Sequence, residues 1–260
     1  MTGSVATTTN ATGRALALAQ QVRSGNVLAV SRLITLLESQ HPDGTEGLRL
    51  LTPDVRPRVV LGVTGYPGAG KSTLINALVS AYRRQAMKVA VLAVDVSSAM
   101  TGGALLGDRI RMQEHALDPG VYIRSMATRG NHGGVARTTD AAKLVLEAAG
   151  YDVILIETVG VGQNEADIMN ITPTVIAVVA PGLGDEVQAM KAGLLELAHI
   201  IVVNKADHPG ADHTLRDLRD WCPTVIASVA TTEEGLSELL AAIAAHQRTY
   251  GSSPAHQRFE

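Results

Sequence analysis

Residues 59–73 read VVLGVTGYPGAGKST. The first five are apolar and mostly β-branched, as is typical of a buried strand, and residues 72–85 follow with a helical pattern. Residues 65–72 match G-x-x-x-x-G-K-[ST] in the strand–loop–helix context that this motif requires. Inward-turned backbone N–H groups and the positive end of a helix attract an anion, so the stretch predicts a site for the phosphates of a nucleoside triphosphate.

Nine consecutive residues are the predicted phosphate contacts. They are Gly65, Tyr66, Pro67, Gly68, Ala69, Gly70, Lys71, Ser72 and Thr73. Lys71 is expected to reach the β- and γ-phosphates and to take part in catalysis, and the Ser72 hydroxyl is expected to bind Mg²⁺. A glycine-rich turn without a ligand is the alternative, which the intact motif and its context disfavour.

Outward from this stretch, short apolar strands alternate with helical patterns. Strands are predicted over residues 59–63, 89–94, 121–123, 153–156, 175–179, 200–203 and 225–227. Helices are predicted over residues 72–85, 138–149, 185–197, 215–221 and 235–247. The alternation predicts an α/β fold with a doubly wound, mostly parallel sheet of about seven strands.

The predicted domain organisation has four parts. Residues 1–13 are expected to be a disordered tail, and residues 14–57 a helical extension and linker, with helices over 14–23 and 27–39. The P-loop domain is expected over residues 58–250, and a C-terminal tail over 251–260. The stretch around Pro42 and Gly44 is interpreted as linker because of its proline and glycine content.

The composition of the chain indicates the type of core, the classes of partner and the location to expect. Of the 260 residues, 46% are hydrophobic and only 3% aromatic, which indicates an aliphatic core. The net charge of −3 gives no electrostatic reason to expect nucleic acid or an anionic membrane. Cys222 is the only cysteine, and no apolar run is long enough for a membrane span, so a cytoplasmic location is expected.

A second motif selects the base. Asn204, Lys205 and Asp207 form N-K-x-D directly after the strand predicted at 200–203. A carboxylate at Asp207 accepts from guanine N1–H and N2–H, donors that adenine does not offer on that edge, so GTP is predicted over ATP. Ser228, Val229 and Ala230 end the next strand and are predicted to offer backbone N–H groups to the guanine carbonyl.

Three carboxylates are candidate magnesium ligands: Asp95 and Glu157, which each follow a predicted strand, and Asp108, which lies in a glycine-rich loop. A turn or helix-capping role is the alternative for each. Gly160 is predicted to offer its N–H to the γ-phosphate, because residues 157–160 occupy the place of a D-x-x-G switch.

Five longer strings identify a family. Residues 94–98, 101–112, 123–130, 157–163 and 180–188 resemble the MeaB family of P-loop GTPases, also called ArgK and MMAA, from about residue 14 to about residue 247. These are G-protein chaperones of adenosylcobalamin-dependent acyl-CoA mutases, usually methylmalonyl-CoA mutase. The resemblance implies slow, mutase-stimulated GTP hydrolysis that gates cobalamin loading and protection. It implies GTP or GDP and Mg²⁺ as ligands without directly bound cobalamin, and the mutase and its adenosyltransferase as partners.

The resemblance also assigns positions. Ser72, Asp108 and Glu157 would surround Mg²⁺, with Asp95 nearby. Residues 97–111, 157–165 and 182–191 would be three switch segments. Arg111 would either stabilise phosphate charge or be a solvated switch residue, and Gln163 would either orient the attacking water or be structural.

Two departures accompany the resemblance. Val96 stands where the family usually has proline. The stretches from 207 to 228 and after Tyr250 are shorter than usual, so the sequence does not predict whether the family homodimer forms, and a shortened subgroup serving a related mutase is an alternative. Three other functions stay open: a nickel-type metallochaperone GTPase, a transport-linked ATPase or kinase, and a nucleotide-binding module without turnover.

Overall fold

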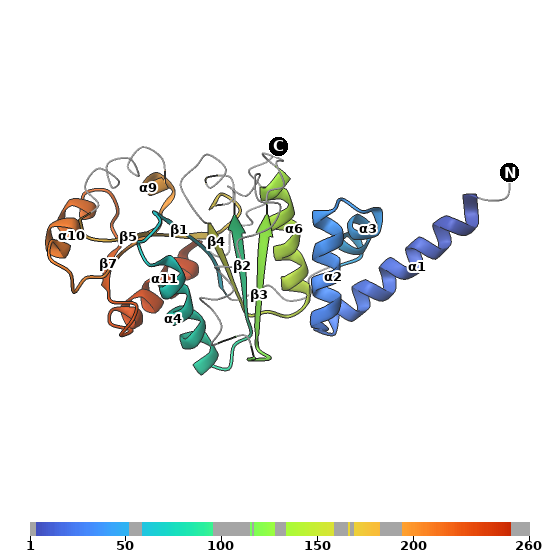
Figure 1. The fold of residues 1–260 in the computed structure, drawn as a ribbon, viewed down its shortest axis with the longest axis horizontal. Coiled ribbons are helices and arrows are strands. Elements are labelled where there is room, and N and C mark those ends of the chain that lie inside the picture. The colour runs from blue at the N-terminus through green and yellow to red at the C-terminus, as the bar shows by residue number, and fades with distance from the viewer. Residues whose placement is uncertain are drawn as a thin grey trace.

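The computed structural model describes residues 4–51, 59–95, 115, 117–127, 134–158, 166, 169–182 and 194–250 (Figure 1). Its centre is a seven-stranded sheet in the order β3-β2-β4-β1-β5-β6-β7. The strands are β1 (Val59–Gly65), β2 (Val89–Asp95), β3 (Val121–Ala127), β4 (Val153–Thr158), β5 (Thr174–Val179), β6 (Ile200–Asn204) and β7 (Val225–Ser228). Every neighbouring pair is parallel, which confirms the predicted fold class.

Helices cover both faces of the sheet because side chains along each buried strand alternate between the faces. Leu61 and Val63 of β1 pack with α4 (Lys71–Arg84) and α11 (Leu236–Tyr250). Val60 lies on the opposite face, in the cluster formed with α6 (Gly134–Ala148). The sheet is therefore the middle layer of a three-layer domain.

The strand order places a reversal of direction at β1. Successive connections lead from β1 to β2 and β3 on one side, and from β4 across β1 to β5, β6 and β7 on the other. Ligands of open parallel sheets bind outside the carboxyl ends of the strands at such a reversal. The carboxyl ends of β1, β4, β6 and β7 meet at this edge, and they carry most of the described candidate residues.

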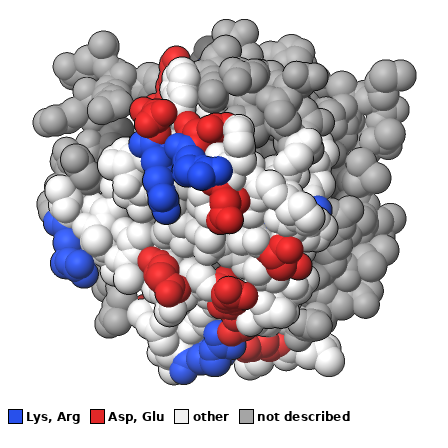
Figure 2. All heavy atoms as spheres, turned by 90° about the vertical axis from the view of Figure 1, so that its left-hand side faces the viewer, with Lys and Arg blue, Asp and Glu red and all other residues white. Residues whose placement is uncertain are grey.

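The helix α9 (Leu194–Leu197) contacts β5, and α10 (Ala211–Arg219) packs against β6 and β7 at the β7 end of the sheet. Most of the helix predicted over 185–197 lies outside the described residues. The α10 helix begins at Ala211, before the predicted start, and buries Leu218 while its other face is charged. Figure 2 views this end of the molecule and shows acidic and basic side chains interspersed over its described surface.

Three helices form the N-terminal extension: α1 (Ser4–Arg23), α2 (Val27–Glu38) and α3 (Pro42–Leu50). The helix α1 begins at Ser4, within the stretch 1–13 that the sequence predicts as a tail. Adding residues to an existing helix costs much less than nucleating one, so a polar run can continue it. In Figure 1, α1 runs outward from the other two helices.

The predicted linker is wrong in part, because α3 occupies it. Pro42 lies in the first turn, where its missing N–H is not needed, and the His41 side chain accepts a hydrogen bond from the Asp43 backbone N–H. The glycines are packing residues: a Cβ on Gly44 would lie 2.8 Å from the backbone of α2, and one on Gly47 would lie 2.8 Å from Leu33. Residues 52–58 lie outside the described part.

A polar junction fastens the extension to the edge strand β3. The Arg124 guanidinium donates to the carbonyl of Ser31, to the Thr35 hydroxyl and to the Glu38 carboxylate. Both side chains of the Arg124–Glu38 pair are 16% exposed. Burial is the largest single effect on Arg124 and lowers its pKa, but the hydrogen bond to Glu38, the Glu38 charge and Tyr122 together outweigh burial and raise the pKa of Arg124 above its ordinary value. Among the described helices, none combines the length and hydropathy needed to cross a bilayer.

Candidate functional site

The phosphate loop, residues 65–72, depends on glycine at two positions. Gly65 has a φ of +141°, and a Cβ there would lie 2.1 Å from the carbonyl oxygen of Val178 on β5. Gly70 has a φ of +92° and caps α4, and a Cβ there would lie 2.2 Å from the Asn204 amide nitrogen. The loop can therefore approach both neighbours only without side chains at these positions.

Lys71 places its ammonium inside this loop. Its side chain is 8% exposed, and Nζ donates to the carbonyl oxygens of Gly65 at 2.6 Å and Tyr66 at 3.1 Å. A buried cation at the positive end of α4 is a strong attractor for an anion. The lysine is thus held where phosphate oxygens would compete with the two carbonyls for its protons.

Ser72 and Glu157 bring two oxygen ligands together at the start of α4 and the end of β4. The Ser72 hydroxyl donates to Glu157 Oε1 at 3.0 Å, and Glu157 is only 2% exposed. Parallel pairing aligns Glu157 with Val63, two residues before the phosphate loop. A hydroxyl and a carboxylate are hard oxygen donors of the kind that Mg²⁺ binds, so this pair fits the predicted ion.

Asn204 joins the phosphate loop to a second loop. Its Nδ2 donates to the carbonyl oxygen of Ala69 at 2.9 Å, and its Oδ1 accepts from the backbone N–H of Ala230 at 3.0 Å. The side chain is 3% exposed. Asn204 therefore satisfies a backbone group from each loop in a buried environment, where an unpaired group would be costly.

The second loop is the base loop, which we define as residues 204–207 and 228–230. The backbone N–H of Ala206 donates to the carbonyl oxygen of Ser228 at 3.0 Å, which fastens its two halves together. Lys205 has a φ of +57°, a left-handed conformation that turns the chain sharply after β6. The Asp207 side chain is exposed, so its carboxylate is open to a ligand.

A comparison with models of protein families shows the family of this chain. The model described as "Methylmalonyl Co-A mutase-associated GTPase MeaB" matches residues 30–260. The chain belongs to the MeaB family. Membership in a family of GTPases implies that it binds GTP and GDP.

Individual proteins that are similar to this MeaB-family chain support the same family assignment. A putative GTPase of Pyrococcus abyssi is 48% identical over 88% of this chain and 75% of its own length. The GTPase ArgK of Escherichia coli is 38% identical over 86% of this chain and 73% of its own. The solved structure of a LAO/AO transport system kinase superimposes with a TM-score of 0.70 at 31% identity, covering 92% of this chain and 77% of that one.

The structure of the MeaB-family chain brings together many residues predicted for the site. The phosphate loop, Glu157 and the base loop converge at one edge of the sheet through the contacts above. Asp95 ends β2 at the same edge. The predictions for Asp108, Arg111, Gly160 and Gln163 lie outside the described residues.

Sequence reasoning missed one role. It placed Asn204 at the base, whereas the structure shows its side chain bridging Ala69 and Ala230. No signal in the sequence predicts these partners, because Asn204 and Ala69 are 135 positions apart.

Proposed function

We propose that this chain is a Mg²⁺-dependent GTPase that acts as a G-protein chaperone, gating cobalamin loading and protection of an adenosylcobalamin-dependent acyl-CoA mutase. The observation that carries the GTPase part is the bridge from Asn204 to Ala69 and Ala230, because it ties a phosphate loop to a loop of the guanine-selecting type. The mutase part rests on the description of the family.

The phosphate loop would hold GTP through its backbone N–H groups and Lys71. On binding, the Lys71 ammonium would exchange the carbonyls of Gly65 and Tyr66 for phosphate oxygens. Charge that develops on those oxygens during hydrolysis would then meet a cation already in position, which is the main source of catalysis in phosphoryl transfer. Ser72 and Glu157 would hold Mg²⁺, which neutralises phosphate charge when bound.

The base loop would select guanine. An Asp207 carboxylate that pairs with guanine N1–H and N2–H would be left without donors by adenine. The backbone N–H groups of residues 228–230 lie on the other half of the loop, and that of Ala230 is already bound to Asn204. The backbone N–H of Val229 donates to the carbonyl oxygen of Glu234 at 3.1 Å, so among these three residues the N–H of Ser228 is the remaining proposed partner of the guanine carbonyl.

Nucleotide state would reach the mutase through the segments that leave this edge. Glu157 accepts from Ser72 and is the first residue of the proposed second switch, residues 157–165. A change at the phosphates that displaces Glu157 would therefore be passed to that segment. Residues 97–111 and 182–191 are the other proposed switches, and Asp95, Asp108, Arg111, Gly160 and Gln163 keep their predicted roles as proposals.

Two variants test the nucleotide site. Lys71→Ala should abolish tight GDP binding in titration calorimetry. Asp207→Asn should bring the affinities for GDP and ADP closer together while leaving the phosphate loop intact. If Asp207→Asn left the preference for GDP unchanged, the base-site assignment would be wrong.

The chaperone part needs a partner-dependent readout. Single-turnover GTP hydrolysis should be slow for the chain alone and faster with its mutase, methylmalonyl-CoA mutase being the first to try. Capture of proteins from the native organism with a GTP analogue bound identifies the mutase if it is a relative. Binding without hydrolysis under both conditions would leave a nucleotide-binding module instead.

The two remaining alternatives, a transport-linked ATPase or kinase and a nickel-type metallochaperone, can be distinguished by their ligands. The superimposed relative is described as a transport system kinase, so ATP is titrated against GTP in the same assay. A nickel chaperone needs cysteine and histidine ligands. Cys222 is 3% exposed, and its thiol lies 3.5 Å from the carbonyl oxygens of His199 and Thr224, which favours a structural role.

A further inference from the structure

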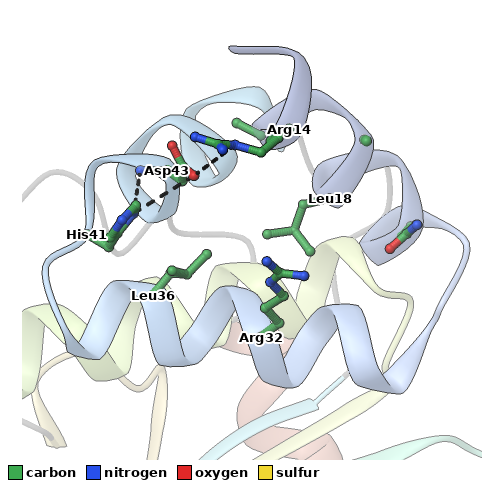
Figure 3. A pocket seen from close by; sticks show the side chains of 9 residues that line it. Arg14, Leu18, Arg32, Leu36, His41 and Asp43 are labelled. Carbon is green, nitrogen blue, oxygen red and sulfur yellow. Dashed lines mark hydrogen bonds and ion pairs between the residues drawn. The ribbon is translucent and has the colours of Figure 1, made fainter. Parts of the chain in front are cut away.

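A cavity of about 430 Å³ lies within the N-terminal extension, at the other end of the molecule from α10. Figure 3 shows that α1, α2 and the start of α3 line it, and Arg14, Arg32 and His41 are exposed at its open side. Its wall includes Arg14, Leu18, Arg32, Leu36, His41 and Asp43. The volume falls within the range of roughly 300–1,000 Å³ that is usual for small-molecule sites.

The charged groups of this cavity do not balance one another. Arg14 Nε lies 3.7 Å from Asp43 Oδ2, which compensates this cation in part. Arg32 forms no hydrogen bond or ion pair within the described residues, and its guanidinium points from α2 toward Leu18 (Figure 3). Two guanidinium groups therefore face a single carboxylate.

Other arginines of the extension are engaged. Arg23 donates to the carbonyl oxygen of Leu50 at 2.7 Å, and Arg49 forms a two-pronged pair with Glu46 at 2.8 Å. Arg32 differs from them because none of its five donors has a partner among the described residues. A planar guanidinium of this kind matches the two oxygens of a carboxylate.

The remaining wall is aliphatic. Leu18 and Leu36 are half-buried and Ala15 is fully buried, so part of a ligand would be shielded from water. One unbalanced positive charge favours a monoanion, because the second charge of a phosphate monoester would be repelled by Asp43. We propose that this cavity binds a small monocarboxylate with a short aliphatic body, its carboxylate on Arg32 and its chain against Leu18 and Leu36.

The test uses the full chain and two probes of equal shape, butanoate and its neutral amide, butanamide. Titration followed by ¹H–¹⁵N NMR should show saturable shifts in α1, α2 and α3 with butanoate and none with butanamide. Arg32→Gln should weaken butanoate binding at least tenfold. Arg49→Gln removes an arginine of the same extension that does not line the cavity, and should bind butanoate like the wild type.

Three results would overturn the proposal. Equal shifts with butanamide would show that the carboxylate is not recognised. Unchanged binding in Arg32→Gln would remove the assigned partner. Tighter binding of a capped peptide with one central glutamate than of butanoate would assign the cavity to a partner's side chain. GDP affinity, which does not depend on Arg32, confirms that each variant is folded, and it keeps this test separate from that of the proposed GTPase.

Discussion

The bridge made by Asn204 gives the sharpest test of how the nucleotide site is assembled. Asn204→Ala removes the donor to the Ala69 carbonyl and the acceptor from the Ala230 N–H, both in a buried position. Each backbone group left unpaired costs about 1–3 kcal/mol, and water entering the vacated space recovers a part. We therefore expect the free energy of unfolding to fall by about 2–4 kcal/mol.

The same change should weaken nucleotide binding, because it uncouples the loop that holds the phosphates from the loop that holds the base. We expect the Kd for GDP to rise about 10- to 100-fold, which corresponds to about 1.4–2.7 kcal/mol. Urea unfolding followed by far-UV circular dichroism measures the stability, and titration calorimetry measures the affinity. The affinity is measured without urea, at a temperature where the variant is folded.

Asn170→Ala is the matched control, since Asn170 is exposed and its change should alter stability by less than about 0.5 kcal/mol. The stability and the GDP affinity test two separate statements about Asn204. If Asn204→Ala kept the stability of the wild type, the buried hydrogen bonds would not contribute as argued. If stability fell but GDP affinity stayed within twofold, the two loops would be positioned independently and the coupling would be refuted.

Three further changes test other parts of the molecule. Gly70→Ala should lower GDP affinity at least tenfold, because the φ of Gly70 is +92° and a Cβ there would lie 2.2 Å from the Asn204 amide nitrogen. Gly68→Ala is the control, since Gly68 has a φ of +82° but no atom within 4 Å of the added Cβ. Calorimetry should show a smaller loss of GDP affinity for Gly68→Ala than for Gly70→Ala. Arg124→Met should destabilise the fold by about 2–4 kcal/mol in urea, because it leaves the Glu38 carboxylate largely buried without its partner; equal stability would show that the junction contributes nothing. Burial lowers the pKa of His246, so the unfolded chain binds the proton more tightly, and stability should be full above the unfolded pKa of about 6.5 and decline as pH falls through it. His246→Gln should reduce that decline in pH-dependent thermal unfolding, and an identical decline would contradict the assignment.

The fold could be predicted from the sequence because each strand is indicated by a short run of consecutive residues. Each of the seven strands is a short apolar run, and the structure lengthens them by at most a few residues, as in β3 (Val121–Ala127) against the predicted 121–123. The helical extension was harder. Gly44 is interpreted as part of a linker, although a Cβ there would lie 2.8 Å from the backbone of α2. A sequence shows that a residue lacks a side chain, but not that another helix needs the space.

The sequence by itself determined the phosphate loop and the guanine motif, because each consists of consecutive residues. It also determined the sheet edge where the two would meet, because the carboxyl ends of parallel strands lie at one edge. Only the tertiary structure decided which atoms join. Ser72 and Glu157 are 85 positions apart, and Asn204 and Ala69 are 135 apart. Strand order, register and the left-handed turns at Gly70 and Lys205 bring these pairs within hydrogen-bonding distance. Such contacts depend on the packing of the whole sheet, and for that reason no local pattern encodes them.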